Sequence, residues 1–266
     1  MDTFLQLFVS GLALGAVYAL VALGFVAVYR SSQVFNFAHG EFLTIGAFGV
    51  VTLASLGMPW GLAVVGSMVL TGLLAAGVER VVLRPLVGRP VFVTIIVTIF
   101  VGFVLRALAL ITWGTDPRGM PTPWDTTWAV ELGGARVLVN SLSAIVGGIL
   151  ALLLYFGVVR RTRLGVAMRA TASDQETAWA LGIPVGRVFA STWFLAGAFA
   201  ALAGVFLGMF PRNVDANLGY VALRAFPAII VGGLDSVGGT VVAGLMLGLL
   251  EVLAQGYVNP LLGDFG

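Results

Sequence analysis

The chain has 266 residues, of which 59% are hydrophobic and only 10% are charged, with a formal net charge of +2. Soluble domains carry about 25% charged residues, so this composition excludes an ordinary water-soluble fold and predicts an all-α, polytopic transmembrane bundle. Lysine and cysteine are both absent. Their absence excludes a Walker-type phosphate loop, a lysine base, disulfides and thiolate metal sites.

A helix needs about 20 apolar residues to cross a bilayer. Such runs repeat along the whole sequence without a polar block long enough for a separate domain, so we expect one transmembrane domain of seven to eight segments. The first run is longer than a signal-peptide core of ~7 to 15 residues, so we expect it to remain as the first span. The predicted segments, of which the second is short and the seventh short or re-entrant, cover 4–28, 41–56, 60–79, 91–112, 139–159, 188–210, 219–233 and 237–258.

Arginine positions predict the orientation, because basic residues favour cytoplasmic loops. If the loop 160–187 is cytoplasmic, nine arginines lie inside and four outside, and the opposite orientation reverses this ratio. We therefore expect an external N-terminus and an external loop at 113–138. This loop contains either a β-hairpin around a Gly-Gly turn or a plain solvated segment. The four arginines expected outside are Arg118, Arg136, Arg212 and Arg224.

Polar residues interrupt the apolar pattern at Asn36-Phe37-Ala38-His39-Gly40-Glu41. Polar side chains this close to hydrocarbon are costly unless they face water or each other. Gly40 permits a helix break, as in the discontinuous helices that line transporter pathways. The alternative is a cytoplasmic turn in which His39 and Glu41 cap the next helix. Asn36, His39 and Glu41 are the first candidates for a translocation pathway.

A second polar interruption, at 232–239, contains four glycines and predicts a sharp turn between helices. Asp235 or Ser236 is expected to cap the helix that begins near Val237, and both are further pathway candidates. Two charged residues remain inside apolar runs. Arg106 is expected to snorkel to the outer interface, and the role of Glu251 is left open.

Glycines four residues apart let helix backbones approach closely in a membrane. Three such pairs predict close packing within the bundle: Gly11 and Gly15, Gly204 and Gly208, and Gly244 and Gly248.

The loop 160–187 contains a capping box, Ser173-Asp174-Gln175-Glu176, followed by the stop signal Gly182-Ile183-Pro184. These signals predict a helix over 173–182. Its apolar residues, among them Trp179, favour docking on another protein. The alternative is a helix lying on the membrane surface.

Five motifs resemble one family over essentially the whole chain, in the same order. They are Y-A-L-V-A-L-G at 18–24, N-F-A-H-G-E at 36–41, Glu79-Arg80 with Arg84-Pro85-Leu86, T-R-L-G at 162–165 continuing through Arg169 to Gly182, and V-G-G-L-D-S-V-G-G at 231–239. The family comprises the permease subunits of branched-chain amino-acid ATP-binding cassette importers, of the first of two types.

This resemblance implies a bacterial inner-membrane subunit that forms half of a pore with a homologous second permease. Two ATPase subunits and an extracytoplasmic substrate-binding protein would complete the importer. The chain itself would bind no cofactor and be no enzyme, since the partner subunits hydrolyse ATP, and no nucleic acid is expected to bind. Coupling to the ATPase is expected to involve Arg163, Gly165, Arg169, Ser173, Glu176, Trp179 and Gly182.

The cargo stays open, because relatives of this family carry branched-chain amino acids, other amino acids, urea or short amides. An ion-driven carrier and an intramembrane enzyme are alternatives from other classes. The enzyme is disfavoured because the acidic residues are scattered singly. Family members usually continue beyond the position of Gly266 into another apolar segment, so the sequence is either a fragment or a natural shortening.

Overall fold

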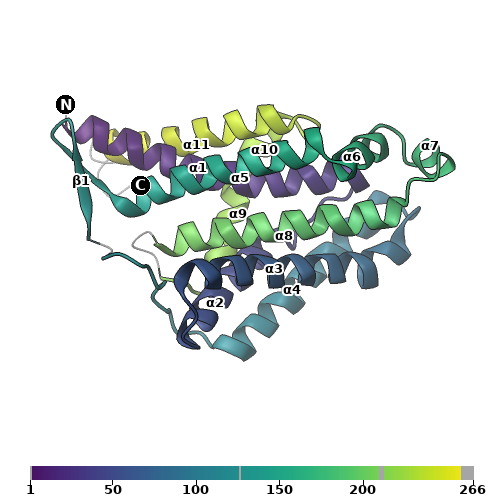
Figure 1. The fold of residues 1–266 in the computed structure, drawn as a ribbon, viewed down its shortest axis with the longest axis horizontal. Helices are drawn as coiled ribbons and strands as arrows, with labels where there is room; N and C mark the ends of the chain where they lie inside the picture. The colour runs from purple at the N-terminus through teal and green to yellow at the C-terminus, as the bar shows by residue number, and fades with distance from the viewer. Residues whose placement is uncertain (1, 126, 210–212, 259–266) are drawn as a thin grey trace.

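The computed structural model describes residues 2–125, 127–209 and 213–258, which form a helical bundle with one small hairpin (Figure 1). This confirms the predicted polytopic all-α fold. Within these residues, six helices are long and apolar enough to cross a membrane. They are α1 (Asp2–Ser32), α3 (Trp60–Val78), α4 (Val91–Trp113), α5 (Val139–Arg161), α8 (Val185–Met209) and α11 (Val237–Tyr257).

Two further segments of the described chain are short or broken. Helix α2 (His39–Ser55) has 17 residues. The stretch expected at 219–233 consists of three pieces: the 3-10 turn η3 (Leu218–Tyr220), α9 (Val221–Arg224) and α10 (Phe226–Gly232). Pro227 stands in the first turn of α10, where its missing N–H removes no helical hydrogen bond. The proline therefore favours a fresh helix start at this point.

The bundle has two distinct ends. Helices α1 and α11 run antiparallel, since Gly244 packs on Ala19 while Gly256 packs on Leu7. The first turn of α1 and the last turn of α11 thus lie at the same end as strands β1 (Ala129–Leu132) and β2 (Ala135–Leu138), which we call the hairpin end (Figure 1). The opposite end, called the α7 end, carries α6 (Arg163–Ser173) and α7 (Gln175–Ala180).

The predicted hairpin is present. Strands β1 and β2 pair antiparallel, with Leu132 opposite Ala135. Gly133 and Gly134 both have positive φ, 58° and 91°, which suits the tight turns that match strand twist. Arg212 and the last residues, 259–266, about which the sequence raised expectations, lie outside the described residues.

The glycine pairs lie where helices approach most closely. A methyl group on Gly248 would collide with the backbone of Gly15, so these positions join α1 to α11. Similarly, Gly204 of α8 lies against the carbonyl of Leu43 on α2. The prediction of close helix packing is confirmed for the glycines of α1 and α11 and for Gly204, whereas Gly208 packs on Met120 and Val214, which lie outside the helices.

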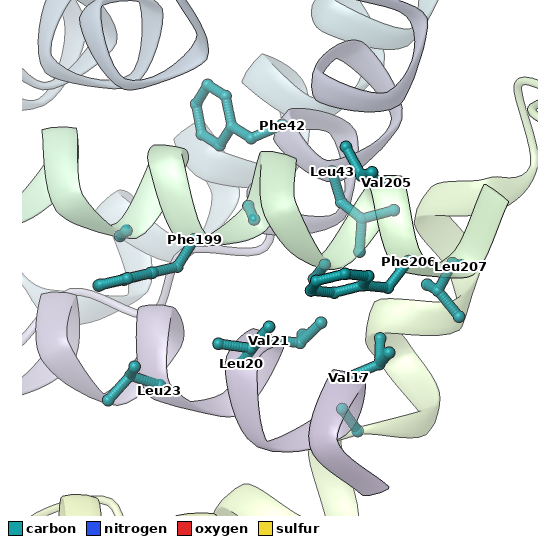
Figure 2. Packing of buried hydrophobic residues seen from close by; sticks show 14 of the residues in the cluster. Val17, Leu20, Val21, Leu23, Phe42, Leu43, Phe199, Val205, Phe206 and Leu207 are labelled. Carbon is teal, nitrogen blue, oxygen red and sulfur yellow. The ribbon is translucent and has the colours of Figure 1, made fainter. Parts of the chain in front are cut away.

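Helix α8 occupies the centre of the bundle, between α1 and the layer of α2 and α3. Its side chains Phe199 and Phe206 lie against Leu20 and Val21 of α1 (Figure 2). By contrast, large apolar side chains on the outer helices are exposed: Phe100, Phe103 and Ile111 on α4, and Leu153 and Leu154 on α5. An apolar exterior around a close-packed interior is the arrangement of a membrane bundle, where packing rather than water exclusion holds helices together.

Candidate functional site

The chain between α1 and α2 turns back into the bundle as a non-helical segment. Two backbone groups of this segment are satisfied by one side chain of α4: Phe37 N–H donates to Thr98 Oγ1 (3.3 Å) and Thr98 donates to the carbonyl of Phe35 (2.9 Å). Asn36 Oδ1 accepts from Ala38 N–H at 3.1 Å. Irregular backbone inside a membrane protein needs such partners, because lipid offers none.

Helix α2 therefore begins near the middle of the bundle. Ala38 faces Gly102, which lies 11 residues into α4, or about 17 Å at 1.5 Å per residue. The backbone of Gly40 meets that of Gly219 in η3, so two broken segments cross here. We call this contact the Gly40–Gly219 crossing. A helix start inside the bundle agrees with the interpretation of a helix break at this motif, although the break precedes His39 and Gly40 itself lies within α2.

The three polar residues of the motif have different surroundings. Asn36 is 1% exposed and His39 is 3% exposed, with the imidazole packed against Gly24 of α1. Both side chains are therefore buried in the part of the chain that the structure describes, and their place on a pathway stays a prediction. Glu41 keeps partial exposure, with 12% of its side chain accessible.

Arg106 does not snorkel, contrary to our expectation. Its Nη1 lies 3.7 Å from Glu41 Oε1, its Nη2 donates to Asn217 Oδ1 at 2.7 Å, and the guanidinium covers the ring of Tyr220. These partners come from α2 and from the broken segment. The ion pair, the hydrogen bond and the cation–π contact thus stabilise the guanidinium inside the bundle without a path to the membrane interface. Arg106, Glu41, Asn217 and Tyr220 form a polar cluster beside the crossing.

A second polar cluster surrounds Glu251, whose role the sequence left open. Its carboxylate accepts from Tyr18 Oη (2.6 Å) and Gln255 Nε2 (3.3 Å). Arg224 Nη1 lies 3.4 Å away, and its side chain is 54% exposed. Arg224 and Tyr220 are four residues apart, so η3 and α9 connect the two clusters.

Asp235 and Ser236 lie apart from both clusters. The Ser236 hydroxyl accepts from Gly239 N–H at 3.0 Å and so caps α11, as one of the two predicted caps. Asp235 is exposed in the same turn. Because Gly244 packs on Ala19, the turn lies at least two helical turns from the level of Ala19 toward the α7 end.

The loop predicted to hold one helix over 173–182 contains two helices, which corrects that prediction. Helix α6 runs through Ser173, so this residue is helical and cannot be the cap. Asp174 is the cap of α7, since its carboxylate accepts from Thr177 N–H at 2.9 Å. This hydrogen bond holds the pKa of the Asp174 carboxyl below its usual value. The capping carboxylate therefore stays charged, and the cap is lost only as pH falls through that lowered pKa.

Helix α7 ends where the sequence predicted. Gly182 has a φ of 83°, and Ile183 N–H donates to the Ala178 carbonyl at 3.0 Å, closing a Schellman motif. Ala178 is buried, whereas Trp179 and Leu181 are 74% and 76% exposed. Helix α7 lies at the extreme end of the molecule (Figure 1), and the helix and its C-cap residue therefore expose two large apolar side chains there.

The other predicted coupling residues fall into two groups. Gly165 and Arg169 fasten α6 to α5: a side chain on Gly165 would collide with the Val159 carbonyl, which also accepts from Arg169 Nη1. Arg163, Ser173 and Glu176 are exposed. Gln175, which we had not singled out for a role, donates to the carbonyl of Ser31 at 3.3 Å and links α7 to α1.

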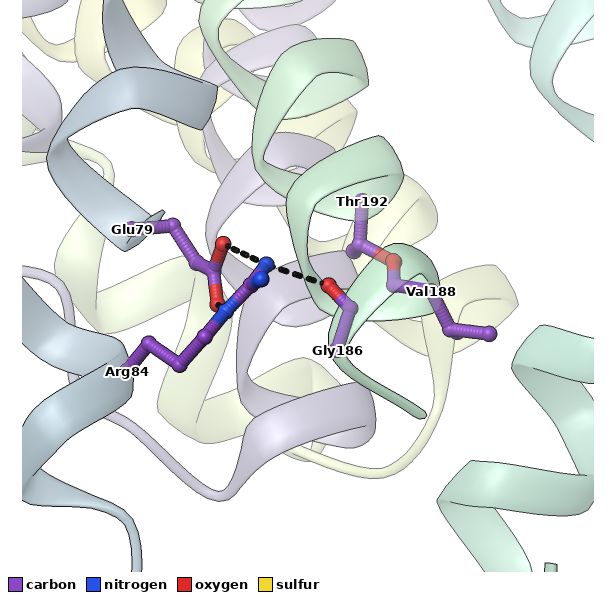
Figure 3. A network of polar contacts seen from close by, with 5 residues as sticks. All are labelled: Glu79, Arg84, Gly186, Val188 and Thr192. Carbon is purple, nitrogen blue, oxygen red and sulfur yellow. Dashed lines mark hydrogen bonds and ion pairs between the residues drawn. The ribbon is translucent and has the colours of Figure 1, made fainter. Parts of the chain in front are cut away.

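Glu79 and Arg84 form an ion pair at the α7 end. The sequence indicated these two residues only as part of a family motif and predicted no contact between them. Helix α3 continues through a π-helical turn, η1 (Glu79–Leu83), into a 3-10 turn, η2 (Arg84–Leu86). This geometry lets Arg84 Nη2 donate to Glu79 Oε2 (2.8 Å) and to the Gly186 carbonyl of α8 (2.6 Å; Figure 3). The Glu79 side chain is 2% exposed, so the pair is a buried connection between α3 and the start of α8.

Comparisons with known proteins agree with this architecture. Residues 7–264 match the family model of the branched-chain amino acid transport system permease component. The high-affinity branched-chain amino acid transport system permease protein LivH of Escherichia coli is 32% identical, over 96% of this chain and 87% of its own length. BraD of Pseudomonas aeruginosa, a permease of the same description, is 31% identical over 93% of this chain and 85% of its own. No solved structure gives a significant match.

Proposed function

Because the chain belongs to the branched-chain amino acid transport system permease family, we propose that it forms half of the pore of an ATP-binding cassette importer for such amino acids. It is a multi-pass membrane permease and not an enzyme. The proposed partners are a homologous second permease, two ATPase subunits that bind and hydrolyse the ATP, and an extracytoplasmic substrate-binding protein. The proposed location is the bacterial inner membrane.

The proposed orientation has the α7 end in the cytoplasm. Arginines gather there, at the ends of α3 and α5 and in the loop that follows: Arg80, Arg84, Arg89, Arg160, Arg161, Arg163, Arg169 and Arg187. Basic residues favour the cytoplasmic side. The hairpin end would then face the substrate-binding protein.

The pathway would follow the exposed face of η3 and α9. Tyr220 is 54% exposed, and so is the side chain of Arg224. An arginine facing hydrocarbon costs at least ~2.5 to 3.5 kcal/mol, so this face is better suited to water or to the second permease. Glu41 and Arg106 would line the path, and the buried residues Asn36 and His39 would pack behind them and hold the start of α2 in place. Asp235 and Ser236 would lie nearer its cytoplasmic mouth.

The observation that carries the proposal is the shape of α7. Its cap, its stop and its link to α1 hold a short helix at which Trp179 and Leu181 are largely uncovered by the described residues. A cleft in an ATPase subunit would cover these side chains. Movement of the ATPase would then reach the bundle through α6 and the end of α1.

Replacing Trp179 with aspartate tests this role. We expect the variant to fold but to lose at least tenfold in co-purified ATPase or in transport per ATP hydrolysed, because a charge replaces the apolar contact. Trp128→Asp is the matched control for ATPase co-purification, since Trp128 is 57% exposed at the hairpin end, away from the proposed ATPase contact. Asp174→Asn, which retains a good capping side chain, should behave as wild type. Full ATPase binding and full coupling in Trp179→Asp would remove the basis for docking through α7.

A further inference from the structure

The Glu251 cluster forms the wall of a cavity that no role described so far explains. This cavity has a volume of about 290 Å³ and lies among α1, α5, α8, α9 and α11, in the half of the bundle nearer the hairpin end. Ligand pockets range from ~300 to 1,000 Å³ for drug-sized molecules, so a space of this size suits a smaller one.

The lining has two chemical halves. Arg224 and Glu251 supply one cation and one anion, with Tyr18, Ser10 and Gln255 beside them. The remaining lining is largely aliphatic: Leu14, Leu138, Leu207, Val221 and Val252. A carboxylate can accept more hydrogen bonds than the three contacts Glu251 has, and Arg224 contacts it through a single nitrogen at 3.4 Å. Both charges thus retain capacity for a ligand.

We infer that this cavity is a transit site for a zwitterionic amino acid with an aliphatic side chain. The ligand's carboxylate pairs with the Arg224 guanidinium, its ammonium group pairs with Glu251, and its side chain lies against the aliphatic wall. Charge-assisted hydrogen bonds of this kind are roughly twice as strong as neutral ones. The inference rests on the proposed function and adds to it a binding site, with a role for each charge, on the external half of the path.

Chemical analogues test the assignment of each charge. The complete complex, without its binding protein, is placed in nanodiscs and titrated with radiolabelled leucine. Competitors are 4-methylpentanoate, which lacks the ammonium group, and 3-methylbutylamine, which lacks the carboxylate. Wild-type complex is expected to prefer leucine at least tenfold over either competitor.

The variants should lose this preference selectively. Glu251→Gln should weaken leucine binding at least tenfold and leave 4-methylpentanoate within threefold of wild type. Arg224→Gln should weaken leucine binding at least tenfold and leave 3-methylbutylamine binding within threefold of wild type. Arg224→Lys should retain part of the preference for leucine. Glu131→Gln, on the hairpin outside the cavity, is the matched control and should bind as wild type.

Two results would overturn the inference: no saturable leucine binding by wild-type complex, or an unchanged preference in both charge-removing variants that retain wild-type thermal stability. Binding-protein-stimulated ATP hydrolysis by the same wild-type complex is measured in parallel. If that stimulation is present while the preference is absent, the transit site fails and the importer function stands. If the stimulation is absent, the importer function itself fails.

Discussion

Replacing Arg84 with alanine is expected to destabilise the permease by about 2 to 3 kcal/mol. The substitution leaves the carboxylate of Glu79, 2% exposed, without its cation, and it removes the hydrogen bond to the Gly186 carbonyl. Breaking a buried ion pair by removing one partner typically costs ~3 to 5 kcal/mol. The loss expected here lies at or below the lower limit of that range because the Arg84 side chain is 35% exposed, so water screens part of the interaction.

Thermal unfolding of the purified permease in detergent measures this effect. Arg80→Ala is the matched control, since Arg80 is an exposed arginine next to Glu79, and it should leave the midpoint almost unchanged. The double variant Glu79→Gln with Arg84→Met removes both charges and should recover much of the loss. An Arg84→Ala midpoint equal to that of Arg80→Ala would show that the pair does not hold α3 to α8.

Valine at Gly40 is expected to have a comparable or larger effect. A side chain there would collide with the carbonyl oxygen and carbon of Gly219. These are backbone atoms, so a rotamer change cannot relieve the collision. Overpacking usually costs ~1 to 3 kcal/mol, and a clash between two main chains belongs at the upper end. The Gly40–Gly219 crossing should open, and the polar cluster of Glu41 and Arg106 should lose its geometry.

The control for Gly40→Val is Gly77→Val, because Gly77 lies in α3 with open space around its Cα. Size-exclusion chromatography and thermal unfolding of both variants give the comparison. We expect Gly77→Val to elute and unfold as wild type, apart from a small helix-propensity cost. If the two variants behave alike, the two broken segments do not depend on close backbone contact.

Local signals in the sequence predicted the membrane helices and several of their ends. Apolar runs of about 20 residues located α3, α4, α5 and α11, because a membrane span depends on composition over its own length. The Gly133-Gly134 turn, the stop at Gly182 and the Ser236 cap were also local. Each depends on the conformation of a few adjacent residues, so no tertiary information was needed.

Helix α6 was missed because its stretch is too polar for a span and looked like a loop. A signal was present: the Thr162 side chain accepts from Gly165 N–H at 3.1 Å, an ordinary helix cap. Recognising α6 would have moved the cap of α7 from Ser173 to Asp174, since a residue inside a helix cannot also have the extended backbone of a cap.

The polar clusters could not be predicted from the chain alone. Arg106 lies 65 residues from Glu41 and 111 from Asn217, and Glu251 lies 233 residues from Tyr18. Nothing in the sequence near Arg106 shows that a broken segment will reach it. An arginine without tertiary partners would be expected to snorkel to the interface. Arg106 does not, because the contacts with Glu41 and Asn217 hold it inside the bundle.

Transport by the reconstituted complex tests the central claim most directly. The permease, its second permease and the ATPases are placed in liposomes with ATP inside, with the binding protein and radiolabelled leucine outside. The account predicts leucine accumulation that requires both ATP and the binding protein, and that excess unlabelled urea does not suppress. Accumulation driven by an ion gradient without ATP, or ATP hydrolysis with no leucine uptake, would contradict it.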